Sequence, residues 1–162
     1  VSLVLVPIVL GAALLGPWAG GWLGLVFGAV VLISGDAAGF MGMNLPGTVI
    51  TVLLKGTVAG FVSGAVYRLI EKKNRTAAMF TSAALCPIIN TALFFCGCYL
   101  FFFEGLTSAA ASGGQTLLAY IIIVLIGGNF IFELVFNLVL APVILRLIDV
   151  GKKMLGQVPK ND

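Results

Sequence analysis

The sequence predicts an all-α integral membrane protein folded as a compact helical bundle, and two observations carry this prediction. The first is composition: of 162 residues, 60% are hydrophobic and only 9% are charged, with a mean hydropathy of +1.17, whereas a soluble domain carries about 25% charged residues. The second is pattern: runs such as "LAYIIIVLIGG" are continuously apolar. Such runs are typical of helices in lipid and lack the alternation of a transmembrane barrel strand.

Five apolar segments are predicted to form the transmembrane helices of this chain: 1–15, 18–34, 46–70, 77–103 and 115–148. A helix needs about 20 residues to cross the hydrocarbon. The last three segments exceed this length, so we expect them to tilt or kink, and the first two are short, which suits close packing inside a bundle. Residues 1–150 are predicted to form one transmembrane domain, and residues 151–162 a cytoplasmic basic tail.

The charged residues near the segment ends predict the orientation. Basic residues cluster near the ends of the third and fifth segments. The two loops on the other side of the predicted bundle, 34–47 and 104–115, have no basic residue, and their only charged residues are Asp36 and Glu104. Basic residues favour the cytoplasmic side, so both basic regions and the C-terminus are predicted to be cytoplasmic, and the net charge of +3 needs no nucleic-acid partner. This orientation puts Val1 outside, and one more helix before Val1 would give a complete protein of six helices. The basic residues are Arg68, Lys72, Lys73 and Arg75, at and after the end of the third segment, and Arg146, Lys152, Lys153 and Lys160, at and after the end of the fifth.

Glycines recur at four-residue spacing in two segments. Gly16, Gly20, Gly24 and Gly28 lie in and before the second segment, and the third carries a similar row at 56, 60 and 64. Small residues at this spacing let helix backbones approach closely in lipid. Two interpretations stay open, namely packing within the protein's own bundle and contact with another membrane subunit.

A few polar residues lie deep in the apolar segments. A charge at the centre of a membrane helix costs about 2.5–3.5 kcal/mol on insertion scales, so Lys55 and Glu133 are unusual there. Asn129, Glu133 and Asn137 are four residues apart and share one helix face. With Asn90 of the fourth segment, Lys55, Asn129 and Glu133 could surround a small polar ligand in an apolar interior. The alternative is that these groups bond to one another and fix helix register, which is the interpretation we favour for Asn137.

The outer loop 34–47, "SGDAAGFMGMNLPG", is rich in glycine and is predicted to be either a flexible lid over the site or a plain connection. It adds Asn44 to the candidate ligand contacts. The loop 104–115, "EGLTSAAASGGQ", is predicted to be a plain connection.

Several chemistries are not indicated. The chain has no histidine, no H-E-x-x-H motif and no phosphate-binding G-x-x-x-x-G-K-[ST] motif. The three cysteines share one apolar segment, where buried thiols pack as small hydrophobic groups. We therefore predict no enzyme activity, no ATP hydrolysis by this chain, no metal site and no cofactor.

The ordered set of "SLVLVPIVLGAALLGPWAGGWLGLVFGAVVLI", "LLKGTVAGFVSGAVYRLIEKKN", "CPIINTALFFCG" and "NFIFELVFNLVLAPVILRLI" resembles the S components of energy-coupling factor (ECF) vitamin transporters. The resemblance implies a six-helix subunit of the bacterial plasma membrane that captures a water-soluble vitamin or related micronutrient from outside. It implies as partners a transmembrane coupling subunit and two cytoplasmic ATPases. Gly16, Gly20, Gly24 and Gly28 would then be candidates for the contact with the coupling subunit.

Two rival functions remain at this stage. One is a self-sufficient small transporter or channel that uses Lys55 and Glu133 as an ion or proton relay. The other is a structural membrane subunit that binds no ligand.

Overall fold

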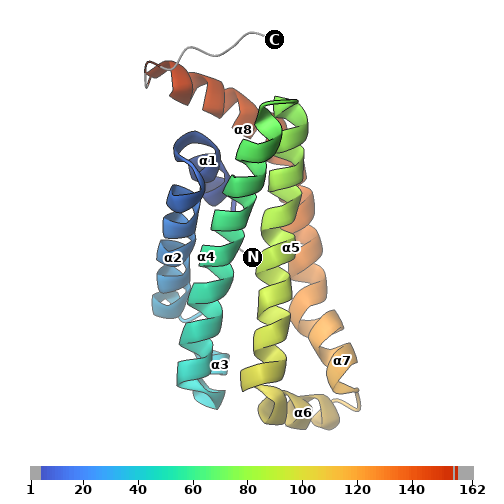
Figure 1. Ribbon diagram of the computed structural model, residues 1–162. Coiled ribbons are helices and arrows are strands. Elements are labelled where there is room, and N and C mark those ends of the chain that lie inside the picture. The colour runs from blue at the N-terminus through green and yellow to red at the C-terminus, as the bar shows by residue number, and fades with distance from the viewer. Residues whose placement is uncertain (1–4, 155, 157–162) are drawn as a thin grey trace.

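The computed structural model describes residues 5–154 and 156, and this part of the chain contains helices and turns but no strand. Long helices run side by side, and short helices close one end of the bundle (Figure 1). The elements are α1 (Leu5–Leu15), α2 (Pro17–Ser34), α3 (Ala38–Met43), α4 (Leu45–Glu71), α5 (Arg75–Phe101), α6 (Phe103–Ser112), α7 (Leu117–Ala119), the π-helix η1 (Tyr120–Gly127) and α8 (Gly128–Met154).

The all-α membrane fold is confirmed. Within the described residues, four helices are long and apolar enough to cross a membrane: α2, α4, α5 and the continuous helix Leu117–Met154. The described part of the first predicted segment, α1, has 11 residues and is therefore roughly 16 Å long. The predicted start of that segment, residues 1–4, lies outside the described residues, and so do residues 155 and 157–162 of the predicted tail.

Glycines bring α2 and α4 into backbone contact. Gly20 lies against Gly60 and Gly24 against Gly56, and a Cβ added to any of these four glycines would overlap the facing carbonyl. A Cβ on Gly28 would lie 2.9 Å from the Val52 carbonyl oxygen. Because no side chain separates these backbones, the two helices share a long and close interface.

Polar caps and a buried serine pair position α4 against α5. Asn44 and Asn74 begin the two helices, and each side chain accepts a hydrogen bond from a backbone N–H of the first turn. Between the helices, Ser82 Oγ donates to the Ser63 carbonyl at 2.8 Å. These contacts fix the register of the α4–α5 hairpin.

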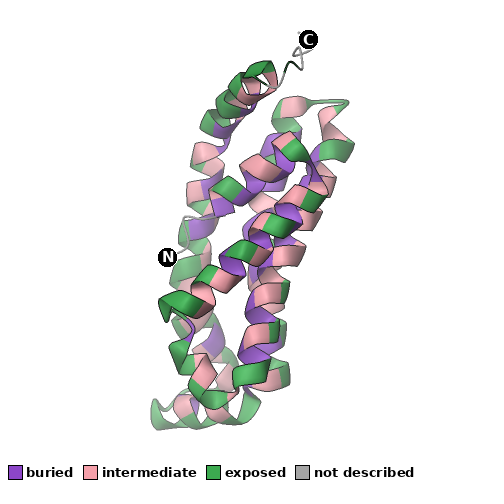
Figure 2. Ribbon diagram, turned by 90° about the vertical axis from the view of Figure 1, so that its left-hand side faces the viewer, coloured by how far each residue is buried: buried purple, intermediate pink, exposed green. Residues whose placement is uncertain are grey.

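The buried residues lie on the inner sides of the helices (Figure 2), and the apolar ones form two clusters. The larger cluster joins α1, α4, α5 and α8 and includes Ile8, Tyr67, Met79 and Ile144. The smaller cluster joins α5, α6 and η1 through Cys98, Phe102, Leu106 and Ile121. It lies at the end of the bundle that α3 and α6 close.

The connections 34–47 and 104–115 contain helices that the sequence did not predict. The first contains α3 and the second is largely the helix α6, and a role of 34–47 as a lid stays a prediction. Aromatic contacts explain the order of the first, because the Phe40 ring packs edge-on against Phe94 at 5.4 Å and Phe102 at 5.1 Å between centroids. Leu106 anchors α6 in the smaller core cluster.

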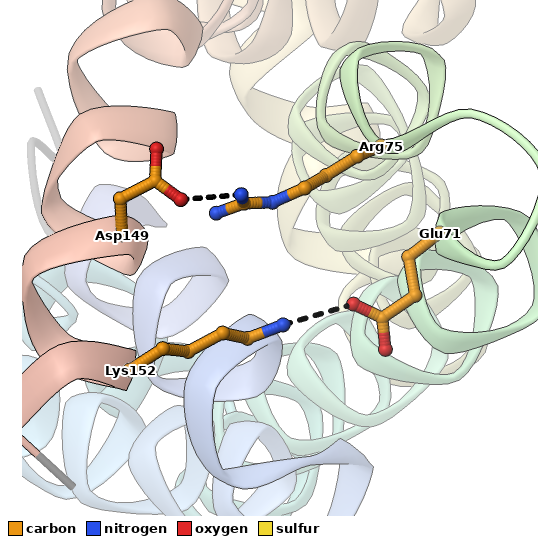
Figure 3. A network of polar contacts seen from close by, with 4 residues as sticks. All are labelled: Glu71, Arg75, Asp149 and Lys152. Atoms are coloured by element: carbon orange, nitrogen blue, oxygen red, sulfur yellow. Dashed lines mark hydrogen bonds and ion pairs between the residues drawn. The ribbon is translucent and has the colours of Figure 1, made fainter. Parts of the chain in front are cut away.

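The opposite end of the bundle holds the basic residues and two ion pairs (Figure 3). Arg75 pairs with Asp149, and Lys152 Nζ lies 3.4 Å from Glu71 Oε2. Both pairs connect the α4–α5 turn to the end of α8, and we call them the α8 latch.

The fifth predicted segment is one helix of 38 residues, Leu117–Met154, with two irregularities. Residues 120–127 form the wider turns of a π-helix, in which a Cβ on Gly127 would lie 2.8 Å from the Ile122 carbonyl oxygen. Pro142 lies inside α8, where its ring removes a backbone hydrogen bond and bends the helix. Beyond this point α8 turns across the end of the bundle (Figure 1).

Candidate functional site

A cavity of about 280 Å³ lies between α2, α3, α4, α5 and the η1–α8 helix. It extends from the exposed turn at Asp36 to the buried Asn90 of α5. Its wall is mixed: eight of the lining residues are apolar and five are polar or charged. The lining residues are Val31, Asp36, Ala37, Phe40, Val52, Lys55, Asn90, Thr91, Phe94, Leu125, Ile126, Asn129 and Phe130.

Lys55 brings a positive charge into this cavity from α4. Its Nζ lies 4.9 Å from the centre of the Phe94 ring, which is within the range of a cation–π interaction. The Glu133 carboxylate also acts on it electrostatically. Lys55 is ten residues from the start of α4 and Asn90 is eleven from the end of α5, so both lie about 15–16 Å from the same end of the hairpin.

Asn90 supplies a buried acceptor. Its side chain is only 5% exposed, and its Oδ1 has no hydrogen-bond partner among the described residues. A buried polar atom without a partner costs about 1–3 kcal/mol. A ligand that donates a hydrogen bond to Asn90 Oδ1 would remove this cost.

Asn129 is oriented by Glu133. Asn129 Nδ2 donates to Glu133 Oε1 at 2.9 Å, one helical turn along α8. This bond uses the amide's donor side toward Glu133 and leaves Oδ1 of Asn129 as an acceptor for other groups. Glu133 itself is 3% exposed and is not one of the lining residues. The carboxylate therefore lies behind the amide that reaches the cavity.

Asn44 and Asn137 lie outside the cavity wall. Asn44 caps α4, and its Nδ2 donates to the Phe101 carbonyl at 3.3 Å, so it joins the start of α4 to the end of α5. Asn137 is buried in α8, at 2% exposure, and its Nδ2 has no hydrogen-bond partner in the part of the chain that the structure describes.

The sequence reasoning missed the aromatic part of the wall. Phe40, Phe94 and Phe130 line the cavity, and Asp36 and Thr91 add polar groups. Phenylalanine occurs 12 times in the chain, so its presence alone gave no signal for a site. Phe94 lies one helical turn after Asn90, and Phe130 directly follows Asn129. This closeness to the candidate polar residues was the available signal for an aromatic wall.

The glycine row of α2 is used inside the bundle. Gly20, Gly24 and Gly28 are buried against α4, and Gly16 lies beside the Arg68 guanidinium. These contacts match the first of the two interpretations above. Contact of the same face with a coupling subunit would require α2 and α4 to separate.

The family of the chain follows from a comparison with protein-family models. Residues 1–145 match the model described as "ECF transporter, substrate-specific component". The protein therefore belongs to this family and is a multi-pass membrane protein that serves as the substrate-binding component of an ECF transporter. No curated protein and no solved structure matches the chain.

Proposed function

We propose that the cavity captures a small water-soluble vitamin or related micronutrient from outside the cell. The protein would then deliver this ligand through a membrane coupling subunit driven by two cytoplasmic ATPases. One observation carries the proposal: Lys55, Asn90 and Asn129, three polar residues from three different helices, line the same cavity.

The size of the cavity supports a small ligand. Ligand pockets in proteins commonly measure about 300–1,000 Å³, and this one, at about 280 Å³, is slightly smaller than that range. Its three phenylalanines suit a flat or apolar part of the ligand, since aromatic side chains offer large contact areas.

The polar groups support a ligand with two kinds of hydrogen-bonding atoms. The Lys55 ammonium is a donor and suits an anionic or carbonyl oxygen. Asn90 Oδ1 and Asn129 Oδ1 are acceptors and suit N–H or O–H groups. Lys55, Asn90 and Asn129 would thus contact the ligand directly. Glu133 would act indirectly by orienting Asn129, and Asn44 by capping α4.

Delivery of the ligand would need other subunits. The phosphate-binding G-x-x-x-x-G-K-[ST] motif does not occur in the sequence, and the family assignment favours a complex with a coupling subunit and ATPases over a self-sufficient ion-coupled transporter. The charge distribution supports a cavity that faces the outside, because its end of the bundle carries Asp36 and Glu104 and the exposed basic residues lie at the other end.

The test begins with the protein purified in mild detergent from cells grown in rich medium. Small molecules released by denaturation are identified by mass spectrometry, and each candidate is then added back while the thermal unfolding midpoint is measured. We expect one compound to co-purify and to raise the midpoint, since a ligand that binds only the folded state stabilises it.

The variant that tests the site itself is Asn90→Leu, which removes the unpartnered acceptor Asn90 Oδ1 and keeps a similar side-chain volume. It should fold and lose most of the ligand-induced rise. If no vitamin or micronutrient co-purifies or raises the midpoint, the capture role is wrong. If the ligand binds but a tagged coupling subunit is never recovered with the protein, delivery through that subunit is wrong.

A further inference from the structure

We propose that the last part of α8, residues 143–154, lies in the membrane interface and binds the headgroups of anionic lipids. We call this part the α8 arm. The inference concerns the end of the bundle opposite the cavity and is independent of the ligand.

Length is the first argument. The continuous helix has 38 residues and would be roughly 57 Å long if straight, whereas the hydrocarbon is about 30 Å thick. Residues 117–142 alone span roughly 39 Å. The arm that follows Pro142 therefore extends beyond the hydrocarbon, and it turns across the end of the bundle rather than continuing straight (Figure 1).

The arm has one face against the protein. Ile144 and Ile148 are buried in the larger core cluster, and a Cβ on Gly151 would lie 3.0 Å from Leu14 of α1. The α8 latch holds the arm from a second side (Figure 3). The arm is thus a fixed part of the fold.

A second face is apolar and exposed. Val143, Leu147, Val150 and Met154 follow the spacing i, i+4, i+7 and i+11, which puts them on one side of the helix. Their exposed fractions are 49%, 47%, 54% and 84%. In a helix at the level of the interface, such a stripe faces the acyl chains next to the headgroups.

A third face, adjacent to the apolar stripe, is basic. Arg146 and Lys153 are seven residues apart, are exposed and point to the same side of the helix. The other ionic residues of the arm, Asp149 and Lys152, are paired in the latch. Two exposed cations beside an apolar stripe fit a bilayer surface with anionic headgroups, since each basic residue near such a surface contributes about 1 kcal/mol.

Trp18 supports the inference that this end of the bundle lies at the level of the lipid headgroups. Its indole is 83% exposed, at the start of α2 and close to the Gly16–Arg68 contact. Tryptophan is enriched at the level of the headgroups. The exposed indole and the arm therefore mark one interface.

The test uses tryptophan quenching by brominated lipids in nanodiscs. Trp18 and Trp22, both exposed, are changed to Phe, and Val150→Trp is introduced as the probe in the full chain. Two bilayers contain the same mixture of phosphatidylglycerol and phosphatidylcholine, with bromine near the headgroup on only one of the two lipids in each. We expect stronger quenching when the bromine is on phosphatidylglycerol, with a local enrichment of that lipid of about fivefold, the fold-change equivalent to ~1 kcal/mol.

Matched variants separate the arm from the rest of the basic end. R146Q/K153Q should abolish the local enrichment of phosphatidylglycerol. K72Q/K73Q removes the same amount of charge from the α4–α5 turn and should leave this enrichment unchanged. A probe at Val124→Trp, exposed on η1, should be quenched equally by either lipid. Met154→Trp serves as a second probe if the variant at 150 unfolds.

Three results would overturn the proposal. One is a probe that neither brominated lipid quenches, and another is equal quenching by both lipids. The third is quenching that disappears when the coupling subunit is added, because that result would assign the apolar stripe to the subunit.

Discussion

Lys55 is the residue on which the chemistry of the cavity depends most. Its side chain lines a cavity of mixed apolar and polar residues, near the Phe94 ring and within the electrostatic reach of Glu133. In lipid-embedded helices, ionisable groups occur where they face a cavity or a partner. The charge is held in place by the protein and remains next to space that a ligand could fill.

Replacing Lys55 by Met should weaken ligand binding by about 10- to 100-fold, because hydrogen bonds to charged groups contribute about 1.5–3 kcal/mol. Isothermal titration with the co-purified ligand measures the change. The control is Lys73→Met, which removes an exposed lysine at the far end of the bundle and should leave affinity unchanged. Equal affinity of the wild type and Lys55→Met would remove Lys55 from the site.

Asn44 and Asn74 form a natural pair for comparing two helix caps. Each accepts from a backbone N–H at 2.9 Å, but only Asn44 also reaches a neighbouring helix, through the Phe101 carbonyl. Loss of a cap costs about 1 kcal/mol.

We expect Asn44→Ala to lower the thermal unfolding midpoint more than Asn74→Ala, since it loses a cap and an interhelical bond. The ligand affinity of Asn44→Ala should fall less than that of Lys55→Met. An affinity loss as large as that of Lys55→Met would instead place Asn44 in contact with the ligand.

At the scale of elements, the sequence was most informative where hydrophobic length and residue spacing act alone. The apolar segments predicted α2, α4, α5 and the long last helix, because burial in lipid depends on composition over about 20 residues. The four-residue spacing of asparagine and glutamate likewise predicted one face of α8, and Asn129 and Glu133 are bonded there.

Features that depend on contacts between distant residues were missed. The helix α3 is stabilised by the packing of Phe40 on two phenylalanines of another segment, and its glycine-rich sequence indicates a loop. The π-helix at 120–127 leaves no mark in a uniformly apolar run. Which partner the glycines of α2 would meet depended on the positions of whole helices, so spacing alone left it open.

The α2–α4 interface gives a sharp test of close packing. Gly24→Ala places a methyl group on the Gly56 carbonyl, and overpacking of this kind costs about 1–3 kcal/mol. We expect a clear drop in the thermal unfolding midpoint. Gly128→Ala is the matched control, because nothing lies within 4 Å of its added Cβ; it should be neutral or slightly stabilising, and similar midpoints for both variants would contradict the packing described here.

At the scale of the whole molecule, charge is divided between the two ends. The end near the cavity carries Asp36 and Glu104, and the other end carries the α8 latch and the exposed basic residues. This division predicts that the basic end faces the cytoplasm.

Cysteine labelling tests this orientation. In a Cys96→Ala background, which leaves two buried cysteines, Gly114→Cys should react with a membrane-impermeant maleimide in intact cells. Lys73→Cys should react only after the membrane is opened. Labelling of Lys73→Cys in intact cells would reverse the orientation and turn the cavity toward the cytoplasm.

The backbone contact between α2 and α4 also limits how the protein can respond to a ligand. Where Gly20 and Gly24 meet Gly60 and Gly56, the two backbones are in contact with no side chain between them, so we expect sliding of α2 along α4 to be disfavoured. We therefore expect the cavity to adapt to a bound ligand on its other side, where α3 and the π-helix η1 line it. We expect α2 and α4 to keep their relative position when a ligand binds, and any rearrangement to fall on α3 and η1.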